Sequence, residues 1–193
     1  MYLPGVQLGS GDKTEVVSAR LVIGADGANS KVRRACFPGR PGPPLLAALQ
    51  ARLACAAPLD AHVVLFACAL TDFYAWAIPK HESVLVGCAF GRRQEARERF
   101  EEVLSWYRRT LGLGDGPVER SGRLLSQPRG RADVFAGAGR VMLAGEAAGL
   151  VSPSSGEGIS FALWSGAAAG RARAPPTPSG PIQNSSGRWR DGS

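Results

Sequence analysis

Two segments of the chain share one arrangement, an apolar run that leads into a loop of small residues and then into a helix-like stretch. The first occupies residues 19–34 and the second residues 139–166. In the second segment, residues 141–144 are apolar and end at a glycine, which predicts a short buried strand. Pro153 prevents a helix from running through the loop, so we expect the helix to begin near Gly156.

The amino end of such a helix is suited to bind an anion. Its first N–H groups have no partner within the helix, and the helix dipole adds partial positive charge there. The segment therefore predicts a loop that holds a phosphate or an electron-rich ring of a cofactor. A glycine-rich connection without a ligand is the alternative, because such connections are common. The presence of two such segments in one chain favours the cofactor interpretation.

Both segments resemble motifs of one flavoprotein family. Residues 24–33 read Gly-Ala-Asp-Gly-Ala-Asn-Ser-Lys-Val-Arg and are similar to the Asp-Gly motif of flavoproteins with the para-hydroxybenzoate-hydroxylase fold. The stretch that starts at Gly145 is similar to the second FAD motif of this family, although Glu146 stands where most members have Asp. The resemblance implies that FAD is the cofactor and that it is bound by Gly24, Asp26, Gly27, Gly145, Glu146, Pro153, Gly156, Gly158 and Ile159.

The resemblance also implies a role for each part of this set. Asp26 and Gly27 would lie near the pyrophosphate and the ribityl chain of FAD. Glu146 would accept a hydrogen bond from a ribityl hydroxyl. The N–H groups around Gly156 and Gly158 would approach the carbonyl edge of the isoalloxazine ring, where they would stabilise the negative charge of the reduced flavin.

A third motif narrows the resemblance to one branch of the family. Residues 74–79 read Tyr-Ala-Trp-Ala-Ile-Pro, and Gly-Cys-Ala follows at residues 87–89. This pattern resembles the Tyr-x-Trp-x-Phe-Pro…Gly-x-Gly signature of geranylgeranyl reductases, with Ile in place of Phe and Ala in place of the last Gly. The resemblance implies that Tyr74, Trp76 and Pro79 line a cavity for an apolar small-molecule substrate. Core aromatic residues on a half-buried strand are the alternative.

Together the motifs predict an FAD-dependent oxidoreductase that reduces double bonds of an isoprenoid or another apolar substrate. The electron donor would be NADPH or another reductant, and no catalytic residue is assigned. An FAD-dependent aromatic-ring monooxygenase would share both FAD motifs and stays open. The family also opens with a Gly-x-Gly-x-x-Gly motif that this sequence lacks. We therefore expect the chain to begin partway through the FAD domain, and an inactive fragment is the second alternative.

The expected fold is α/β in the mixed α+β sense, a partial Rossmann-like FAD-binding domain with an inserted antiparallel sheet. Residues 1–36 and 128–170 would form the FAD-binding part, and residues 37–127 the substrate part. Short alternating runs in the substrate part predict strands, and apolar residues at three- and four-residue spacing predict a helix over 93–111. Residues 171–193, rich in Pro, Ser, Gly and Arg, predict a disordered tail.

Composition argues against several other classes of protein. The net charge is +7, but part of it belongs to arginines of the tail, the helix around Arg92 to Arg109 carries both signs, and no platform of aromatic and basic residues is present. Nucleic-acid binding is therefore not expected. No stretch is apolar enough to span a bilayer, and the start of the chain lacks the pattern of a signal peptide. We expect a cytoplasmic protein that touches a membrane surface only if its substrate is a lipid; the oligomeric state is not indicated.

The spacing of the four cysteines does not predict a metal site. Cys36, Cys55, Cys68 and Cys88 form no C-x-x-C pair, and the chain has only two histidines, so no zinc site is expected. Buried free thiols are the default interpretation, and Cys68 and Cys88 lie in apolar, strand-like runs. For Cys88, which lies within the third motif, a position facing the flavin is the alternative.

Overall fold

The computed structural model describes residues 5–10, 13–55, 59–92 and 94–172. The strands are β1 (Gly5–Ser10), β2 (Lys13–Ser18), β3 (Val22–Gly24), β4 (Leu45–Cys55), β5 (Val63–Leu65), β6 (Ala75–Lys80), β7 (Ser83–Phe90), β8 (Leu113–Ser126), β9 (Gly137–Ala138) and β10 (Val141–Leu143). The helices are α1 (Lys31–Cys36), α2 (Ala96–Leu111) and α3 (Ile159–Arg171), and the 3-10 turns are η1 (Arg131–Asp133) and η2 (Gly145–Ala148). These elements confirm the mixed α/β class and agree with a partial FAD-binding domain of the flavoprotein fold.

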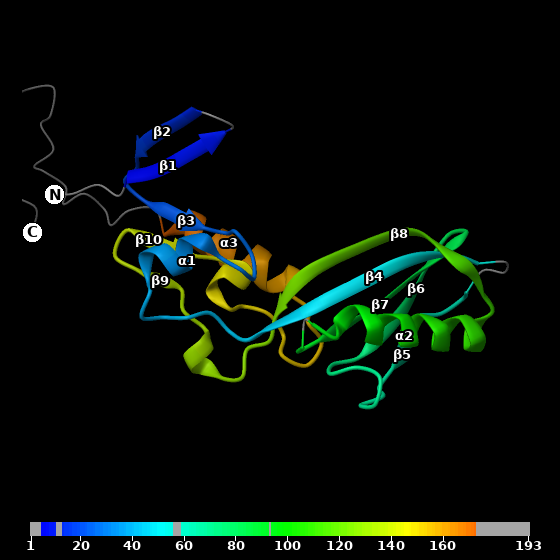
Figure 1. Cartoon of the computed structure of the whole chain (residues 1–193). Coiled ribbons are helices and arrows are strands. Elements are labelled where there is room, and N and C mark those ends of the chain that lie inside the picture. The colour runs from blue at the N-terminus through cyan, green and yellow to red at the C-terminus, as the bar shows by residue number, and fades with distance from the viewer. Residues whose placement is uncertain (1–4, 11–12, 56–58, 93, 173–193) are drawn as a thin grey trace, which may run out of the picture.

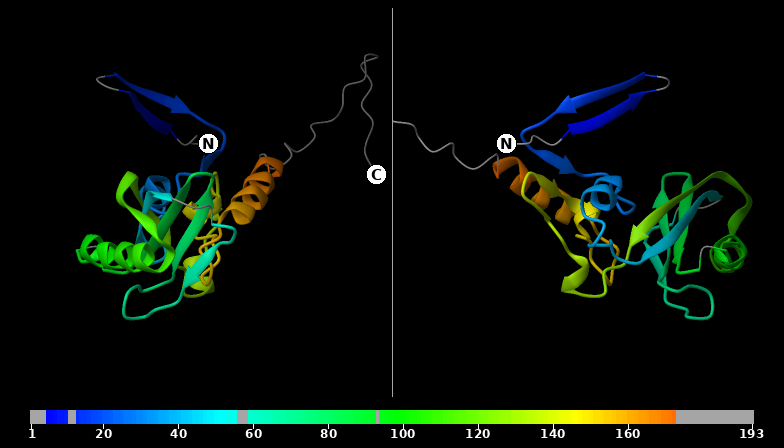
Figure 2. Two further views of the ribbon diagram at one scale, coloured as in Figure 1. Left: turned by 90° about the vertical axis from the view of Figure 1, so that its right-hand side faces the viewer. Right: turned by 60° about the vertical axis from the view of Figure 1, so that its left-hand side comes forward.

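The largest sheet is antiparallel, with its strands in the order β5-β6-β7-β4-β8. Its central strand, β4, pairs with both β7 and β8 along most of its length. Alternation along the strands directs one set of side chains toward α2 and the other set toward the opposite face. Figure 1 shows α2 along one side of this sheet. The opposite face lies toward the loop that precedes α3 (Figure 2), and Tyr74 on this face contacts Ser155 in that loop.

The main hydrophobic core lies between the large sheet and α2. The helix was expected over 93–111 and is observed from Ala96 to Leu111. It ends at Gly112, whose φ of 62° is a left-handed conformation that favours glycine. The buried side chains of the helix follow the apolar spacing of the sequence and are those of Ala96, Phe100, Val103, Leu104 and Tyr107. Strands β6 and β7 meet them with Ala75, Ala77, Val84, Val86, Cys88 and Phe90.

The second sheet is small and brings both motif segments together. Strand β10 pairs parallel with β3 and antiparallel with β9. The two strands that precede the motif loops therefore lie side by side, and both loops leave the sheet at the same edge. Helix α1 packs against β3 and β10, while α3 packs against η2. Strands β4 and β8 extend from this part of the molecule to the far end of the large sheet (Figure 1).

Arg33, on α1, joins the segments around the small sheet. Its side chain is buried. Its guanidinium group donates hydrogen bonds to four backbone carbonyl oxygens, those of Arg40 (3.0 Å), Pro41 (2.9 Å), Asp133 (3.0 Å) and Ala147 (3.3 Å). A buried charge is tolerated where its donors are satisfied in this way. The residue thereby fixes α1 against the connection to β4, η1 and η2, a role that the sequence analysis did not predict.

The two ends of the described chain differ, because the first two strands project outward whereas α3 packs against η2. Strands β1 and β2 form a hairpin that projects away from both larger sheets (Figure 2). Helix α3 continues to Arg171, so the first residue of the predicted disordered tail is helical. The rest of the predicted tail, from residue 173, lies outside the described residues. Within the described ranges, none of the helices has the length and apolar character needed to cross a membrane.

Candidate functional site

The loop after β3 is organised by Asp26. Its carboxylate accepts hydrogen bonds from Ser30 Oγ (2.6 Å) and from the N–H groups of Lys31 (2.6 Å) and Val32 (3.2 Å). Burial by itself would raise the pKa of Asp26, but these hydrogen bonds outweigh it and lower the pKa below its usual value. Gly27 follows in the turn with a φ of 77°, which favours glycine. The Asp-Gly pair therefore shapes the loop and fixes the start of α1.

The second motif loop begins at η2 and is tied to the large sheet by Glu146. Gly145 takes a φ of 57°, and its N–H donates to Ser165 Oγ on α3 (2.8 Å). Glu146 Oε1 accepts a hydrogen bond from the N–H of Ser126 (2.9 Å), the last residue of β8. One oxygen of the carboxylate is thus engaged in holding two parts of the fold together. The group retains acceptor capacity for a hydroxyl of a ligand.

The helix after this loop begins at a later residue than predicted from the sequence. We expected a start near Gly156, but α3 starts at Ile159. The reason is that Gly156 has a φ of 67°, outside the right-handed helical region, and its N–H already donates to the carbonyl oxygen of Ser152 (2.9 Å). Gly158 caps the helix without a side-chain hydrogen bond. Of the N–H groups expected to face a ligand, those at Gly158 and Ile159 remain.

The two motif loops and the start of α3 border a cavity of about 410 Å³, which we call the glycine-lined cavity. Its walls carry few long side chains, so a ligand can reach the backbone. From the predicted cofactor-binding set, the lining includes Gly27, Gly145, Glu146, Gly156, Gly158 and Ile159. It also includes Ala25, Leu125, Ala144, Ala162 and Gly166. Segments far apart in the sequence thus form one site.

The other three residues of that set do not line the glycine-lined cavity. Gly24 is buried, and a Cβ atom there would lie 2.8 Å from side-chain atoms of Val32 and Leu143, so glycine is needed for close packing of α1 on the sheet. Asp26 directs its carboxylate to the start of α1. Pro153 is exposed in the turn between η2 and α3. These three residues shape the loops around the cavity.

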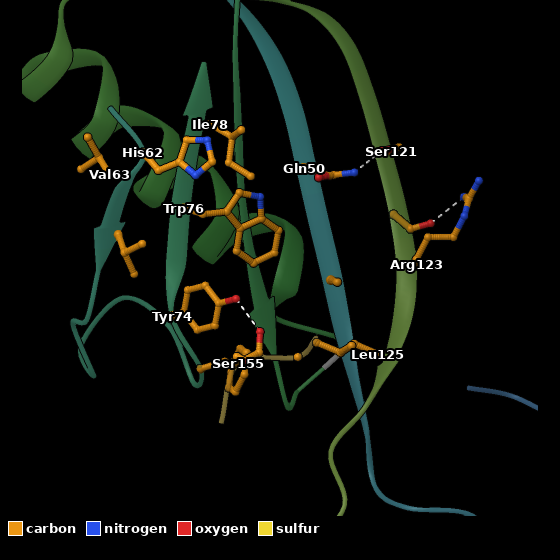
Figure 3. A pocket seen from close by; sticks show the side chains of 15 residues that line it. Gln50, His62, Val63, Tyr74, Trp76, Ile78, Ser121, Arg123, Leu125 and Ser155 are labelled. Atoms are coloured by element: carbon orange, nitrogen blue, oxygen red, sulfur yellow. Dashed lines mark hydrogen bonds between the residues drawn. The ribbon is translucent and has the colours of Figure 1, made fainter. Parts of the chain in front are cut away.

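A second cavity of about 430 Å³ lies on the face of the large sheet opposite α2, and we call it the aromatic pocket (Figure 3). Tyr74 and Trp76 of the predicted substrate set line it, together with Ile78. Pro79 does not line it, because strand alternation places Pro79 on the face of β6 that carries Ala75 and Ala77. Ile78, where the resembled signature has Phe, thus faces the pocket directly.

Aromatic rings form one wall of this pocket. The ring centroid of Tyr74 lies 4.6 Å from that of Phe73, 5.6 Å from that of Trp76 and 5.8 Å from that of Phe66. Trp76 pairs across the strands with Gly87, and a Cβ atom at Gly87 would lie 2.4 Å from the indole ring. The first glycine of the third motif therefore gives the indole its space against β7.

The two cavities meet at Leu125 and Gly156, which line both. At this junction the hydroxyl of Tyr74 donates a hydrogen bond to the carbonyl oxygen of Ser155 (2.6 Å), as Figure 3 shows. Leu125 precedes Ser126, whose N–H holds Glu146. The boundary between the two cavities is thus formed by side chains of the large sheet together with the backbone of the motif loop.

The aromatic pocket also has a polar side, formed by Gln50, His62, Ser121 and Arg123. Gln50 Nε2 donates to Ser121 Oγ across β4 and β8 (3.4 Å). In Figure 3, Gln50 and Ser121 lie away from the junction at Ser155 and Leu125. A ligand that extends from the junction along the aromatic wall would therefore meet hydrogen-bonding groups at its other end.

The cysteines agree with the expected buried free thiols only in part, since Cys88 is buried but Cys36 and Cys68 are exposed. Cys88 is buried in the core shared with α2 and is not part of the aromatic pocket lining, and burial raises the pKa of its thiol to about 12. Cys68 was expected in a buried strand but is exposed in the connection between β5 and β6, because β5 ends at Leu65. Cys36 is exposed as well. In the described part of the chain, His, Cys, Asp and Glu form no group of three or more that could hold a metal ion.

Several residues that build the two cavities were not predicted from the sequence. Leu125, Ser126 and Gln50 belong to β4 and β8, strands far apart in the sequence whose pairing has no local signal. Ser155 contributes a backbone oxygen, which any residue type could supply. Phe73 directly precedes the third motif, so its aromatic ring was the one available signal.

The sequence matches a known domain family and a bacterial relative. It matches the FAD binding domain family over residues 4–170. It is 34% identical over 150 residues to the protein CbrA of Escherichia coli, and this alignment covers 76% of the chain and 41% of CbrA. The chain therefore spans less than half the length of this relative.

Solved structures show the same fold. A geranylgeranyl bacteriochlorophyll reductase-like protein from Thermoplasma acidophilum matches with a TM-score of 0.69 at 20% identity, over 86% of this chain and 44% of that protein. PqsL, a probable FAD-dependent monooxygenase from Pseudomonas aeruginosa, matches with a TM-score of 0.52 at 24% identity, over 81% of this chain and 46% of PqsL. At these identities the likeness establishes the fold alone. The family match over most of its length shows that the chain belongs to the FAD binding domain family, with FAD as the cofactor.

Proposed function

We propose that the chain is part of a flavin-dependent reductase that saturates a carbon–carbon double bond of an isoprenoid or another apolar small molecule. The observation that carries this proposal is the junction at Leu125 and Gly156, where the glycine-lined cavity meets the aromatic pocket. A planar cofactor in the first cavity and an apolar chain in the second would approach each other there. The similarity to the reductase-like protein of Thermoplasma acidophilum supports this choice.

The residues of the glycine-lined cavity fit the ring and ribityl parts of FAD. A Cβ atom at Gly156 would lie 3.2 Å from Leu125 Cδ2 and would narrow the junction, so glycine keeps it open. The N–H groups at Gly158 and Ile159 are suited to the carbonyl edge of the ring, and Glu146 to a ribityl hydroxyl. When bound, reduced FAD supplies the hydride for the double bond, a proton completes the addition, and NADPH or another reductant restores the reduced cofactor.

The aromatic pocket would hold and orient the substrate. Tyr74 and Trp76 present ring faces and Ile78 a branched side chain, so an apolar chain gains buried contact and loses water there. Orientation of the reacting bond toward the junction is the main contribution that such a wall makes to the rate. Under this proposal, residues 1–36 and 128–170 serve the cofactor, residues 37–127 serve the substrate, and the protein acts in the cytoplasm without a nucleic-acid partner.

Titration of the purified chain with FAD, followed by flavin fluorescence and the visible spectrum, tests the cofactor site. We expect saturable binding in the micromolar range that is weakened in Glu146→Ala. Glu146→Gln separates the role of the hydrogen bond to Ser126 from the role of the negative charge. The amide oxygen of Gln can still accept from the Ser126 N–H, while the charge is lost. Glu101→Ala is the matched control: this carboxylate pairs with Arg120 and lies outside the glycine-lined cavity. Absence of FAD binding by the wild-type chain would favour an inactive fragment.

The chemical step is tested with the FAD-loaded, reduced protein and geranylgeraniol in the absence of oxygen. We expect reoxidation of the flavin with formation of a saturated product, and a slower reaction in Trp76→Ala. A monooxygenase acting on an aromatic ring is the second candidate, favoured by Gln50, His62 and Ser121 in the pocket. It predicts no anaerobic reoxidation and an oxygen-dependent hydroxylated product instead.

A further inference from the structure

We propose that Tyr74 is a positioning residue that couples the two cavities, because its hydroxyl holds the loop at residues 152–158 that borders both. Its first role, as part of the pocket wall, needs only the ring. The second role needs the hydroxyl group and does not follow from the sequence motif. The identity of the two coupled ligands rests on the proposed function, whereas the contact between Tyr74 and the loop does not.

The hydroxyl of Tyr74 makes a defined contact. It donates to the carbonyl oxygen of Ser155 at 2.6 Å, between residues 81 positions apart in the sequence. Phe66, Phe73 and Trp76 surround the ring and fix its direction. Burial raises the pKa of the Tyr74 phenol, so the group stays protonated and able to donate at neutral pH.

The loop that receives this hydrogen bond is closed by two backbone hydrogen bonds of its own. The N–H of Gly156 donates to the carbonyl oxygen of Ser152 (2.9 Å). The N–H of Ser152 donates in turn to the carbonyl oxygen of Glu157 (2.8 Å). These two bonds close a compact turn around Ser155. Gly156, within the turn, lines both cavities, and Gly158 directly after it lines the glycine-lined cavity. A restraint at Ser155 therefore acts on the walls of both cavities.

Coupling between the ligands follows from this arrangement. An apolar molecule packed on the Tyr74 ring favours the ring position that donates to Ser155. FAD in the glycine-lined cavity would favour the same arrangement of the loop, because Gly156 and Gly158 line that cavity. Two ligands that stabilise one arrangement raise each other's affinity by the same factor. Removal of the hydroxyl would break this link while the aromatic wall remains.

Amide hydrogen exchange of the ligand-free chain tests the contact itself. In Tyr74→Phe, we expect the amides of Ser152 and Gly156 to exchange roughly fivefold faster than in the wild type, the effect of losing one neutral hydrogen bond. The exchange rates of the amides in β4 and β7 should be the same in the variant and the wild type. Tyr107→Phe is the matched control, since Tyr107 packs in the core shared with α2. Equal exchange of the loop in the wild type and Tyr74→Phe would overturn the proposal.

The FAD dissociation constant, measured with and without saturating geranylgeraniol, tests the coupling. We expect geranylgeraniol to tighten FAD binding about fivefold in the wild type and to leave it unchanged in Tyr74→Phe, which still binds geranylgeraniol through its ring. A purely structural role would weaken FAD binding equally in both conditions. The same fivefold tightening in the variant would contradict the proposal. If the wild type binds no FAD, the proposed function fails, and the exchange experiment still decides the role of Tyr74.

Discussion

Gly87 gives the indole of Trp76 its place in the aromatic pocket, and this dependence leads to a prediction. In Gly87→Ala, the added methyl group would lie 2.4 Å from the indole ring, so the ring or strand β7 must move. We expect a loss of about 1–3 kcal/mol in the free energy of unfolding, the usual cost of overfilling a packed site. Tryptophan fluorescence should shift as well, because the indole changes its surroundings. Urea unfolding and emission spectra measure both effects.

A second glycine of the large sheet provides the control for this substitution. Gly116 lies in β8, and a Cβ atom there would meet no atom within 4 Å. Gly116→Ala should therefore unfold at the same urea concentration as the wild type or at a slightly higher one, since alanine restricts the unfolded chain. If Gly87→Ala and Gly116→Ala are equally stable, the close approach of Trp76 to Gly87 does not constrain the pocket.

At the scale of elements, the strand–loop–helix order of both motif segments was predictable, because local patterns determine it. Residues 141–144 and the small residues after them are enough to place β10 and the loop, whereas the 3-10 turn η2 was not predicted. The start of α3 was misplaced because the left-handed conformation of Gly156 and its hydrogen bond to Ser152 have no counterpart in the sequence pattern. The contributions of Leu125 and Gln50 to the cavities could not be predicted from the sequence either, because these contributions depend on pairing between distant strands.

The start of α1 allows a prediction on stability and its pH dependence. Asp26→Ala removes the acceptor for Ser30 Oγ and for two backbone N–H groups, and we expect it to cost about 1–2 kcal/mol near neutral pH, as for other lost helix caps. The folded protein holds the pKa of Asp26 below the usual value of 3.8. The stabilisation is therefore complete above that value and is lost as the pH falls through the lower pKa of the folded state.

Urea unfolding of the wild type and Asp26→Ala at about pH 7 and at about pH 3 checks this sign. The difference in the free energy of unfolding between the two proteins should be smaller at the lower pH. Asp60→Ala, which removes an exposed carboxylate before β5, should not change stability at either pH. A difference that is equal at both pH values, or larger at the lower one, would show that ionised Asp26 does not stabilise the start of α1.

At the scale of the whole molecule, α3 presents an apolar surface to solvent. Ile159, Leu163 and Trp164 are 75%, 69% and 79% exposed, and Ile23 at the outer strand of the small sheet is 42% exposed. Large apolar side chains that are exposed together on one helix promote association. The outer edge of β3 is also unpaired within the part of the chain that the structure describes, and an unpaired edge is a second site of association. The purified chain is therefore expected to self-associate through this face.

Replacing Leu163 and Trp164 together by lysine tests this expectation, because neither residue lines the glycine-lined cavity. We expect sedimentation velocity to show concentration-dependent assemblies for the wild type and mainly monomer for the double variant. Circular dichroism should be similar for both proteins, since these side chains are exposed. Val16→Lys on the projecting hairpin is the control, because Val16 is exposed to a similar degree, 70%, at a separate place.

If the wild type is a monomer at every concentration tested, or if Val16→Lys has the same effect, the face of α3 does not drive association. If the double variant also keeps the FAD affinity of the wild type, then Leu163 and Trp164 serve association and not cofactor binding, in agreement with their absence from the cavity lining that includes Ile159 and Ala162.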